Sequence, residues 1–522
     1  PVEAGPRVPP GYELLSASGC ATGRWSFGAH RLAVLGITFL CYTGYHMSRK
    51  PPSIVKSVLS PVGESRVGWA PFNGANGDSL LGMCDFAFLS TYAAGMFVSG
   101  HLGDTLDLRL FLTIGMVGAG LLVVLFGMGC YWDIHSFWYY AVVQALGGLF
   151  QSTGWPSVVS IVANWFGKGR RGFIMGVWNA HTSVGNILGS LVAASMLKRN
   201  WGLAFIVPGL VMSAMGAVVY LFLIVHPEDA GFRDPNNTGG EHESGAQAGE
   251  KEGLLPPNDL DSPSSTPKMH SRSGAKGVGI QAALRIPGVI TFSLCLFFTK
   301  LVAYTFLYWL PFYIERTKVG GVFLSPTASG SLSTLFDLGG VAGGILAGWL
   351  SDKYNARSLT SAGFVFLSIP TLYIFREYGH VSRSVNVFLL LLSGCFVNGP
   401  YALITTAVSA DLGTHESLKG NAKALATVTA IIDGTGSIGA AIGPMLTGYI
   451  SQAGGENAWT LVFFMLYTAD LCAGLLLFRL VLKEVRTLFA VGAPPLRRSR
   501  LGEDGGADAS DAEAGDKKAL KE

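Results

Sequence analysis

Charged residues are scarce in this sequence. Asp, Glu, Lys and Arg make up 14% of the 522 residues, and hydrophobic residues make up 49%. A soluble globular domain carries about 25% charged residues. This deficit, spread over many long apolar runs, excludes an ordinary soluble domain and indicates a protein that crosses a membrane many times. The net charge of +3 is too small to predict a nucleic-acid partner.

The sequence also lacks the patterns that many enzymes and metalloproteins need. Its seven cysteines are scattered, with neither the spacing of a metal site nor that of a disulfide framework. It contains no nucleophile–base motif and no phosphate-cradling glycine loop of the Walker type. We therefore expect no metal, no cofactor and no enzymatic activity.

The chain does contain twelve long apolar segments, each near or above the roughly 20 residues that a helix needs to cross a bilayer. They lie at about 30–58, 82–103, 108–129, 135–165, 172–197, 202–226, 286–314, 328–350, 358–376, 385–412, 420–451 and 457–482. We predict an all-α membrane protein with two six-helix bundles, at 30–226 and 286–482. The composition of 1–29, of the linker at 227–285 and of 483–522 predicts disorder.

The distribution of positive charge predicts the orientation. With the N-terminus inside, the inner loops and tails hold more Lys and Arg than the outer loops and span ends, where Lys56 is one of few. Both termini and the linker are therefore expected in the cytosol.

An internal repeat relates the two sets of segments. The pattern Gly-xxx-Asp-xxxx-Arg follows segment two, with Asp104 and Arg109, and segment eight, with Asp352 and Arg357. The two copies are 352 − 104 = 248 residues apart. A repeat of this kind predicts two parallel six-helix halves around a site near the middle of the membrane.

One face of the first segment carries polar and charged side chains that are costly to bury in a membrane. Tyr42, Tyr45 and Arg49 are spaced i, i+3 and i+7, so they share one side of a helix. An Arg or Lys at the centre of a membrane helix costs about 2.5–3.5 kcal/mol. A guanidinium keeps its proton, and its planar fork suits a phosphate or a carboxylate. The alternative is that Arg49 and Lys50 only mark the membrane edge.

A second face lies on segment seven. Lys300, Tyr304 and Tyr308 are spaced i, i+4 and i+8, and we expect them to approach the first face from the other half. The alternative is an interfacial anchor with an aromatic belt. Asn179 and His181 lie on the Gly-rich fifth segment, where a packed histidine and a ligand are equally plausible.

Four acidic residues lie in apolar segments. Asp337 and Asp433 are candidate charge partners or proton carriers, whereas Asp85 and Asp470 are interpreted as structural. Lys50 is either a charge of the site or the partner of an acid such as Asp337.

Several motifs resemble known families. The repeated Gly-xxx-Asp-xxxx-Arg loop resembles the signature loop of the major facilitator superfamily. Tyr42-xx-Tyr45-xxx-Arg49-Lys50 looks like the first helix of the organophosphate:phosphate antiporters. Longer runs resemble the animal sugar-phosphate exchangers of solute carrier family 37, in particular the longer endoplasmic-reticulum members; these runs are residues 46–51, 152–157, 164–168, 178–185, 398–401 and 418–444.

This resemblance implies the major facilitator fold, with twelve transmembrane helices. It implies exchange of a sugar phosphate, similar to glucose 6-phosphate, for inorganic phosphate in the endoplasmic-reticulum membrane. It implies that Arg49 is the phosphate clamp and that the signature loops are gates. One departure is that the family's basic residue of segment seven falls at Ala303, one turn after Lys300.

Electrostatics suggest why such a protein would exchange anions. A buried, unpaired positive charge is costly to enclose at low dielectric, and a bound phosphate offsets that cost. One alternative keeps the fold and makes the protein a proton-driven symporter of another organic anion, with Asp337 or Asp433 as the proton carrier. Another is a scaffold or regulator that transports nothing. The expected partners are thus a sugar phosphate, inorganic phosphate and the bilayer, and the sequence leaves protein partners undefined.

Overall fold

The computed structural model describes residues 8–17, 25–61, 68–103, 106–166, 178–232, 280–413, 423–453 and 455–492. Across these residues the chain is helical, and one isolated bridge between Val319 and Val322 is the extent of its β structure. Eight helical stretches in the described ranges are long and apolar enough to cross a membrane. The expectation of an all-α membrane protein is confirmed.

Two of the predicted spans in the first half are divided. The first span breaks at Lys50, because Pro51 has no N–H to continue the helix and instead begins a new one. The fourth breaks at Ser152 and Thr153. The helices of this half are α2 (Phe27–Arg49), α3 (Pro51–Leu59), α4 (Gly77–Gly103), α5 (Leu108–Tyr131), α6 (Phe137–Gln151), α7 (Gly154–Trp165), α9 (His181–Met196) and α10 (Leu203–Phe222).

The second half repeats this arrangement with longer helices. A π-helical turn at Ile404–Val408 joins two of them. Asp470 accepts a hydrogen bond from Ser368, which agrees with a structural role for this acid. The helices are α12 (Val289–Arg316), α13 (Pro326–Tyr354), α14 (Arg357–Tyr378), α15 (Arg383–Leu403), α16 (Ser409–Gly413), α17 (Lys423–Ala453) and α18 (Ala458–Gly492).

Helix also covers parts of the segments expected to be disordered. α1 (Pro10–Ala17) packs on α10, with the Tyr12 ring 6.4 Å from that of Phe222. α18 runs past residue 482, and its Glu484 carboxylate accepts hydrogen bonds from the backbone N–H groups of Ser358 and Leu359 at the start of α14. Short helices cover Pro227–Ala230 and α11 (Ile280–Leu284), and the rest of the predicted tails and linker lies outside the described residues.

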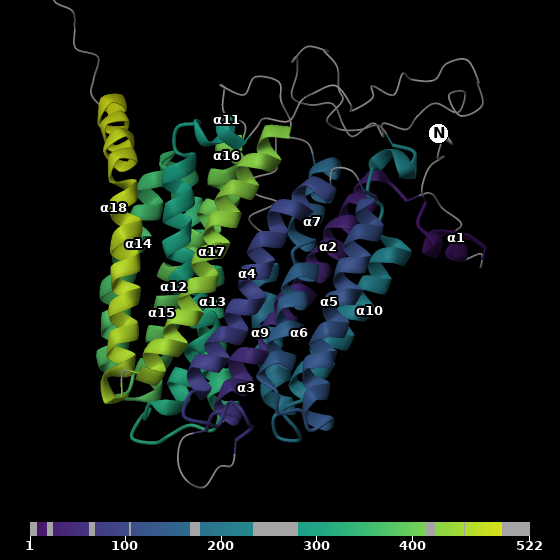
Figure 1. Ribbon diagram of the computed structural model, residues 1–522. Coiled ribbons are helices and arrows are strands. Elements are labelled where there is room, and N and C mark those ends of the chain that lie inside the picture. The colour runs from purple at the N-terminus through teal and green to yellow at the C-terminus, as the bar shows by residue number, and fades with distance from the viewer. Residues whose placement is uncertain are drawn as a thin grey trace, which may run out of the picture.

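The two halves lie side by side, and few elements join them (Figure 1). α4 packs against α17, α9 against α13, and α3 against α12. At the crossing of α4 and α17, a Cβ atom on Gly82 would lie 3.2 Å from the Cα atom of Gly448. α3 lies at one end of the bundle and α16 at the opposite end (Figure 1), and we refer to these as the α3 end and the α16 end.

Candidate substrate-binding site

Arg49 ends α2 and is almost completely buried, with 4% of its surface exposed. Its Nε donates a hydrogen bond to Oε1 of Gln151 at 2.6 Å, and its guanidinium carbon lies 4.7 Å from the centre of the Tyr92 ring. Its Nη2 has no hydrogen-bond partner among the described residues. A guanidinium has five N–H donors, so Arg49 retains unused capacity to bind an acceptor.

The tyrosines of the two predicted faces surround this guanidinium. Tyr42 and Tyr45 are buried on α2, with their rings 5.4 Å apart. From the other half, Tyr304 and Tyr308 of α12 are buried, and α12 packs against α3, which begins two residues after Arg49. The structure therefore brings the two faces together between the halves, as their spacing suggests.

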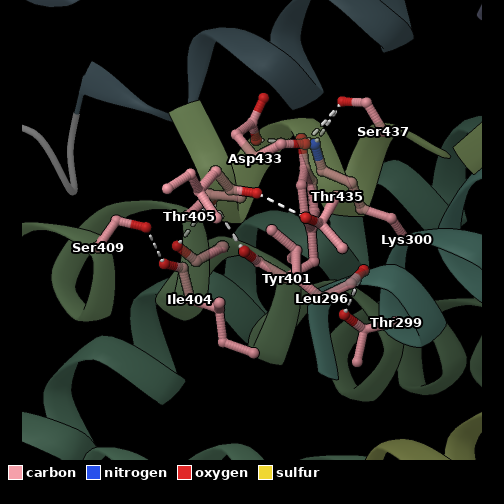
Figure 2. Close-up of polar contacts among 12 residues, drawn as sticks. Leu296, Thr299, Lys300, Tyr401, Ile404, Thr405, Ser409, Asp433, Thr435 and Ser437 are labelled. Carbon is pink, nitrogen blue, oxygen red and sulfur yellow. Dashed lines mark hydrogen bonds and ion pairs between the residues drawn. The ribbon is translucent and has the colours of Figure 1, made fainter. Parts of the chain in front are cut away.

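Lys300 is buried in the second half, where it forms an ion pair with Asp433 (Figure 2). Its Nζ lies 2.8 Å from Oδ1 of Asp433 and 3.4 Å from Oγ of Ser437. The centres of the Tyr304 and Tyr401 rings lie 6.0 and 5.5 Å from the same nitrogen. Lys300 thus points into the protein interior, where an acid neutralises it.

Lys50 joins the two halves. Its Nζ lies 3.1 Å from Oδ2 of Asp337 on α13, and both side chains are buried. Asn186 of α9 donates a hydrogen bond to the other carboxylate oxygen at 3.0 Å. Of the two roles considered for Lys50, this geometry favours the partner of Asp337.

A third ion pair was missed in the sequence. Lys56, counted there among the outer loops and span ends, is 1% exposed, and its Nζ lies 2.8 Å from Oδ2 of Asp85. The Tyr308 and Trp309 rings of the other half cover it, with centres 5.4 and 5.1 Å away. Lys56 follows Arg49 by seven residues, a spacing that puts two residues on the same side of an unbroken helix. The break at Pro51 changes the direction of the helix, so the spacing alone does not predict where Lys56 points.

These pairs leave one exception. The described residues contain four buried Lys or Arg side chains, and three of them have an Asp partner. For Arg49, the close contacts in the described part of the chain are the Gln151 amide and the face of the Tyr92 ring. Because a buried cation without a counter-charge is costly, this is where an anion would bind most favourably.

A cavity of about 140 Å³ lies between the halves, next to the Arg49 cluster. Arg49 does not line it, but His46, which precedes Arg49 by three residues on α2, does. From the first half it is lined by His46, Asn179 and Asn186, and from the second by Tyr304, Asn398 and Tyr401, among others. It extends to Asp352 and Arg357, towards the α16 end.

The two candidates on the fifth segment separate in the structure. Asn179 lines the cavity, whereas His181 does not. His181 is completely buried against aromatic rings, with ring centres 4.3 Å from Trp178 and 4.7 Å from Tyr42. This geometry favours the packed histidine over the ligand, and the sequence gives no sign of which way the helix is rotated.

The second signature loop is held by ion pairs. Arg357 lies 2.5 Å from Asp352 and 2.9 Å from Asp411, and both acids belong to the same half as the arginine. In the first copy, Asp104 lies outside the described residues, and Arg109 stands in the first turn of α5. Asp107 accepts hydrogen bonds from two N–H groups at the start of that helix, which explains an acid at this position.

At the α3 end, by contrast, polar contacts join the two halves. Asp78 of α4 lies 2.9 Å from the Arg316 guanidinium at the end of α12. The same carboxylate accepts hydrogen bonds from Ser60 and from Ser451 of α17. The α3 end is therefore closed by contacts between the halves, while the cavity extends towards the α16 end.

Comparisons with known proteins agree with this architecture. The family model of the Major Facilitator Superfamily matches residues 68–417 and 321–503. A solved structure described as a bacterial homolog to the human lysosomal transporter Spinster, in an inward-facing and unoccupied conformation, superposes with a TM-score of 0.58. It covers 89% of this chain and 99% of its own, and at 15% identity it supports the fold alone.

Full-length relatives are much more similar. "Putative glycerol-3-phosphate transporter 4" of Arabidopsis thaliana is 52% identical over 92% of this chain and 95% of its own length. "Glucose-6-phosphate exchanger SLC37A2" of Bos taurus is 51% identical over 90% of this chain and 96% of its own. The chain is thus a multi-pass membrane protein that belongs to the Major Facilitator Superfamily and, within it, to the organophosphate:phosphate antiporters related to solute carrier family 37.

Proposed function

We propose that this protein is a secondary transporter that exchanges a sugar phosphate for inorganic phosphate by alternating access. The printed names of its relatives, a glucose-6-phosphate exchanger and a glycerol-3-phosphate transporter, support this substrate class. They support transport and not catalysis as the activity of the chain.

The single observation that carries the proposal is the unpaired Arg49. A buried guanidinium that no described carboxylate neutralises favours binding of a phosphate, which takes two parallel hydrogen bonds from such a fork. Binding offsets the cost of the buried charge and permits the halves to rock. An empty carrier would keep that cost, so movement without an anion is disfavoured and the cycle runs as exchange.

Other residues have supporting roles in this proposal. Lys300 becomes a second phosphate ligand when it leaves Asp433, and Tyr42, Tyr45, Tyr304 and Tyr308 form the polar walls of the site. Lys50 and Asp337 link the halves around the bound anion. Asp352 and Arg357, with Asp104 and Arg109 in the first copy, act as gates at the α16 end.

The location and orientation extend the proposal. An excess of positive charge near the α16 end supports a cytosolic position for this end and for both termini. The α3 end then faces the lumen of the endoplasmic reticulum, the membrane suggested by the sugar-phosphate exchangers that the chain resembles. Two six-helix bundles, at 30–226 and 286–482, would move relative to each other.

The test is counterflow in proteoliposomes of the purified protein. Liposomes loaded with inorganic phosphate should take up labelled phosphate, glucose 6-phosphate or glycerol 3-phosphate, and empty liposomes should not. Uptake driven by a pH gradient into phosphate-free liposomes would contradict exchange and indicate proton symport instead.

A further inference from the structure

We propose that the cavity beside Arg49 binds the hydroxyl groups of the transported organophosphate, and that His46 and Asn186 recognise them. This inference rests on the proposed exchange function. It goes further because it assigns specificity for a polyhydroxylated organic group to named residues that do not hold the phosphate.

The first argument is position. His46 precedes Arg49 by three residues on α2, so their side chains are neighbours on the helix surface, with Cβ atoms about 5–6 Å apart. His46 lines the cavity and Arg49 does not. A phosphate held by Arg49 can therefore direct its ester group past His46 into the cavity.

The second argument is unused hydrogen-bonding capacity. His46 is 4% exposed and Asn186 is 5% exposed. Nδ1 of His46 and Oδ1 of Asn186 make no hydrogen bond of normal geometry with a described residue, although the two side chains lie close enough to interact with each other. Buried polar atoms are normally paired, and a hydroxyl group, which both donates and accepts, would satisfy either atom.

The third argument is the size and chemistry of the cavity. A water molecule's share of liquid volume is roughly 30 Å³, so a cavity of about 140 Å³ has room for a polar group of several non-hydrogen atoms. Asn179, Thr182 and Asn398 add amide and hydroxyl groups to its walls, while Leu307 and Phe336 add apolar surface. This mixture suits a polyol, whose hydroxyl groups alternate with C–H faces.

A neighbouring histidine provides a matched control. The His181 ring lies 5.8 Å from the His46 ring, is equally buried, and also has a ring nitrogen without a partner among the described residues. It differs in that it does not line the cavity. Packing alone would make the two histidines equivalent, whereas hydroxyl recognition requires His46.

The experiment measures inhibition of labelled phosphate exchange in proteoliposomes by glucose 6-phosphate, glycerol 3-phosphate and methyl phosphate. Methyl phosphate keeps the phosphate and lacks the hydroxyl groups. His46→Phe keeps an aromatic ring and removes the ring nitrogens. In this variant the preference for glucose 6-phosphate over methyl phosphate should fall about tenfold or more. His46→Gln should recover part of it, and His181→Phe should leave the ratio near that of the parent protein.

Asn186→Leu is the second variant, and it should also reduce the preference. The inference is overturned if His46→Phe and Asn186→Leu still exchange phosphate and keep the parent preference, or if His181→Phe loses it equally. If the parent protein exchanges no phosphate, the proposed function itself fails, and that result is distinct from an unchanged ratio.

Discussion

Arg49 and Lys300 are buried cations on the long first helix of each half, α2 and α12, and their surroundings differ. Lys300 is neutralised by Asp433 and hydrogen-bonded to Ser437. Arg49 has an amide and an aromatic face as its close partners in the described part of the chain. The two halves share one pattern, but their cations differ in availability. Arg49 can bind an anion directly, whereas Lys300 is already paired with Asp433.

This difference gives the two cations different roles in binding phosphate. A lysine paired with an aspartate can approach an incoming phosphate only if the acid releases it. Arg49 cannot lose its proton and has no acidic partner in the described ranges, so it attracts the phosphate first. The comparison predicts that changes at paired cations will affect stability or tuning, and that changes at Arg49 will affect exchange itself.

The largest effect is expected at the completely buried pair Lys56–Asp85, which represents a paired cation away from the cavity. Lys56→Met leaves Asp85 without its partner and should destabilise the protein by about 3–5 kcal/mol. Thermal unfolding of detergent-solubilised protein measures this. The double variant with Asp85→Leu should recover most of the loss, and an equally unstable double variant would show that the pair itself is not the cause.

Exchange should depend most strongly on Arg49. Arg49→Gln removes the charge while keeping a polar side chain, and we expect phosphate exchange to fall about 100-fold, which corresponds to about 2.8 kcal/mol. Arg49→Lys should be intermediate, because it restores the charge without the planar fork. Normal exchange by a correctly folded Arg49→Gln protein would remove the distinction between the two cations.

A smaller effect, about tenfold, is expected from the Lys300–Asp433 pair. Asp433→Asn frees Lys300 and should lower the KM for phosphate, which makes the second half resemble the first. Lys300→Met should raise it, and the double variant should lie between the two. The measurement is the phosphate dependence of exchange, and equal KM values in all three variants would contradict a latent second ligand.

Much of the fold followed from the sequence. Apolar segments of membrane length are visible in the local composition, and the motif repeated 248 residues apart indicates two similar halves. The faces with Arg49 and Lys300 also followed, since helical spacing decides which residues share a side. Lys56 did not, because the break at Pro51 interrupts the helical phase. The contacts of Gln151 and Tyr92 with Arg49 depend on helix packing, which one sequence does not encode in any local pattern.

The central claim is that Arg49 needs a phosphate because none of the described carboxylates pairs with it, and Gln151→Glu tests it most directly. Oε1 of Gln151 already accepts the hydrogen bond from Arg49, so this substitution adds an anion with little change of shape. Phosphate binding to the purified protein, measured by calorimetry, should weaken at least tenfold while the unfolding temperature is maintained or rises. Unchanged phosphate affinity in a folded Gln151→Glu protein would contradict the account.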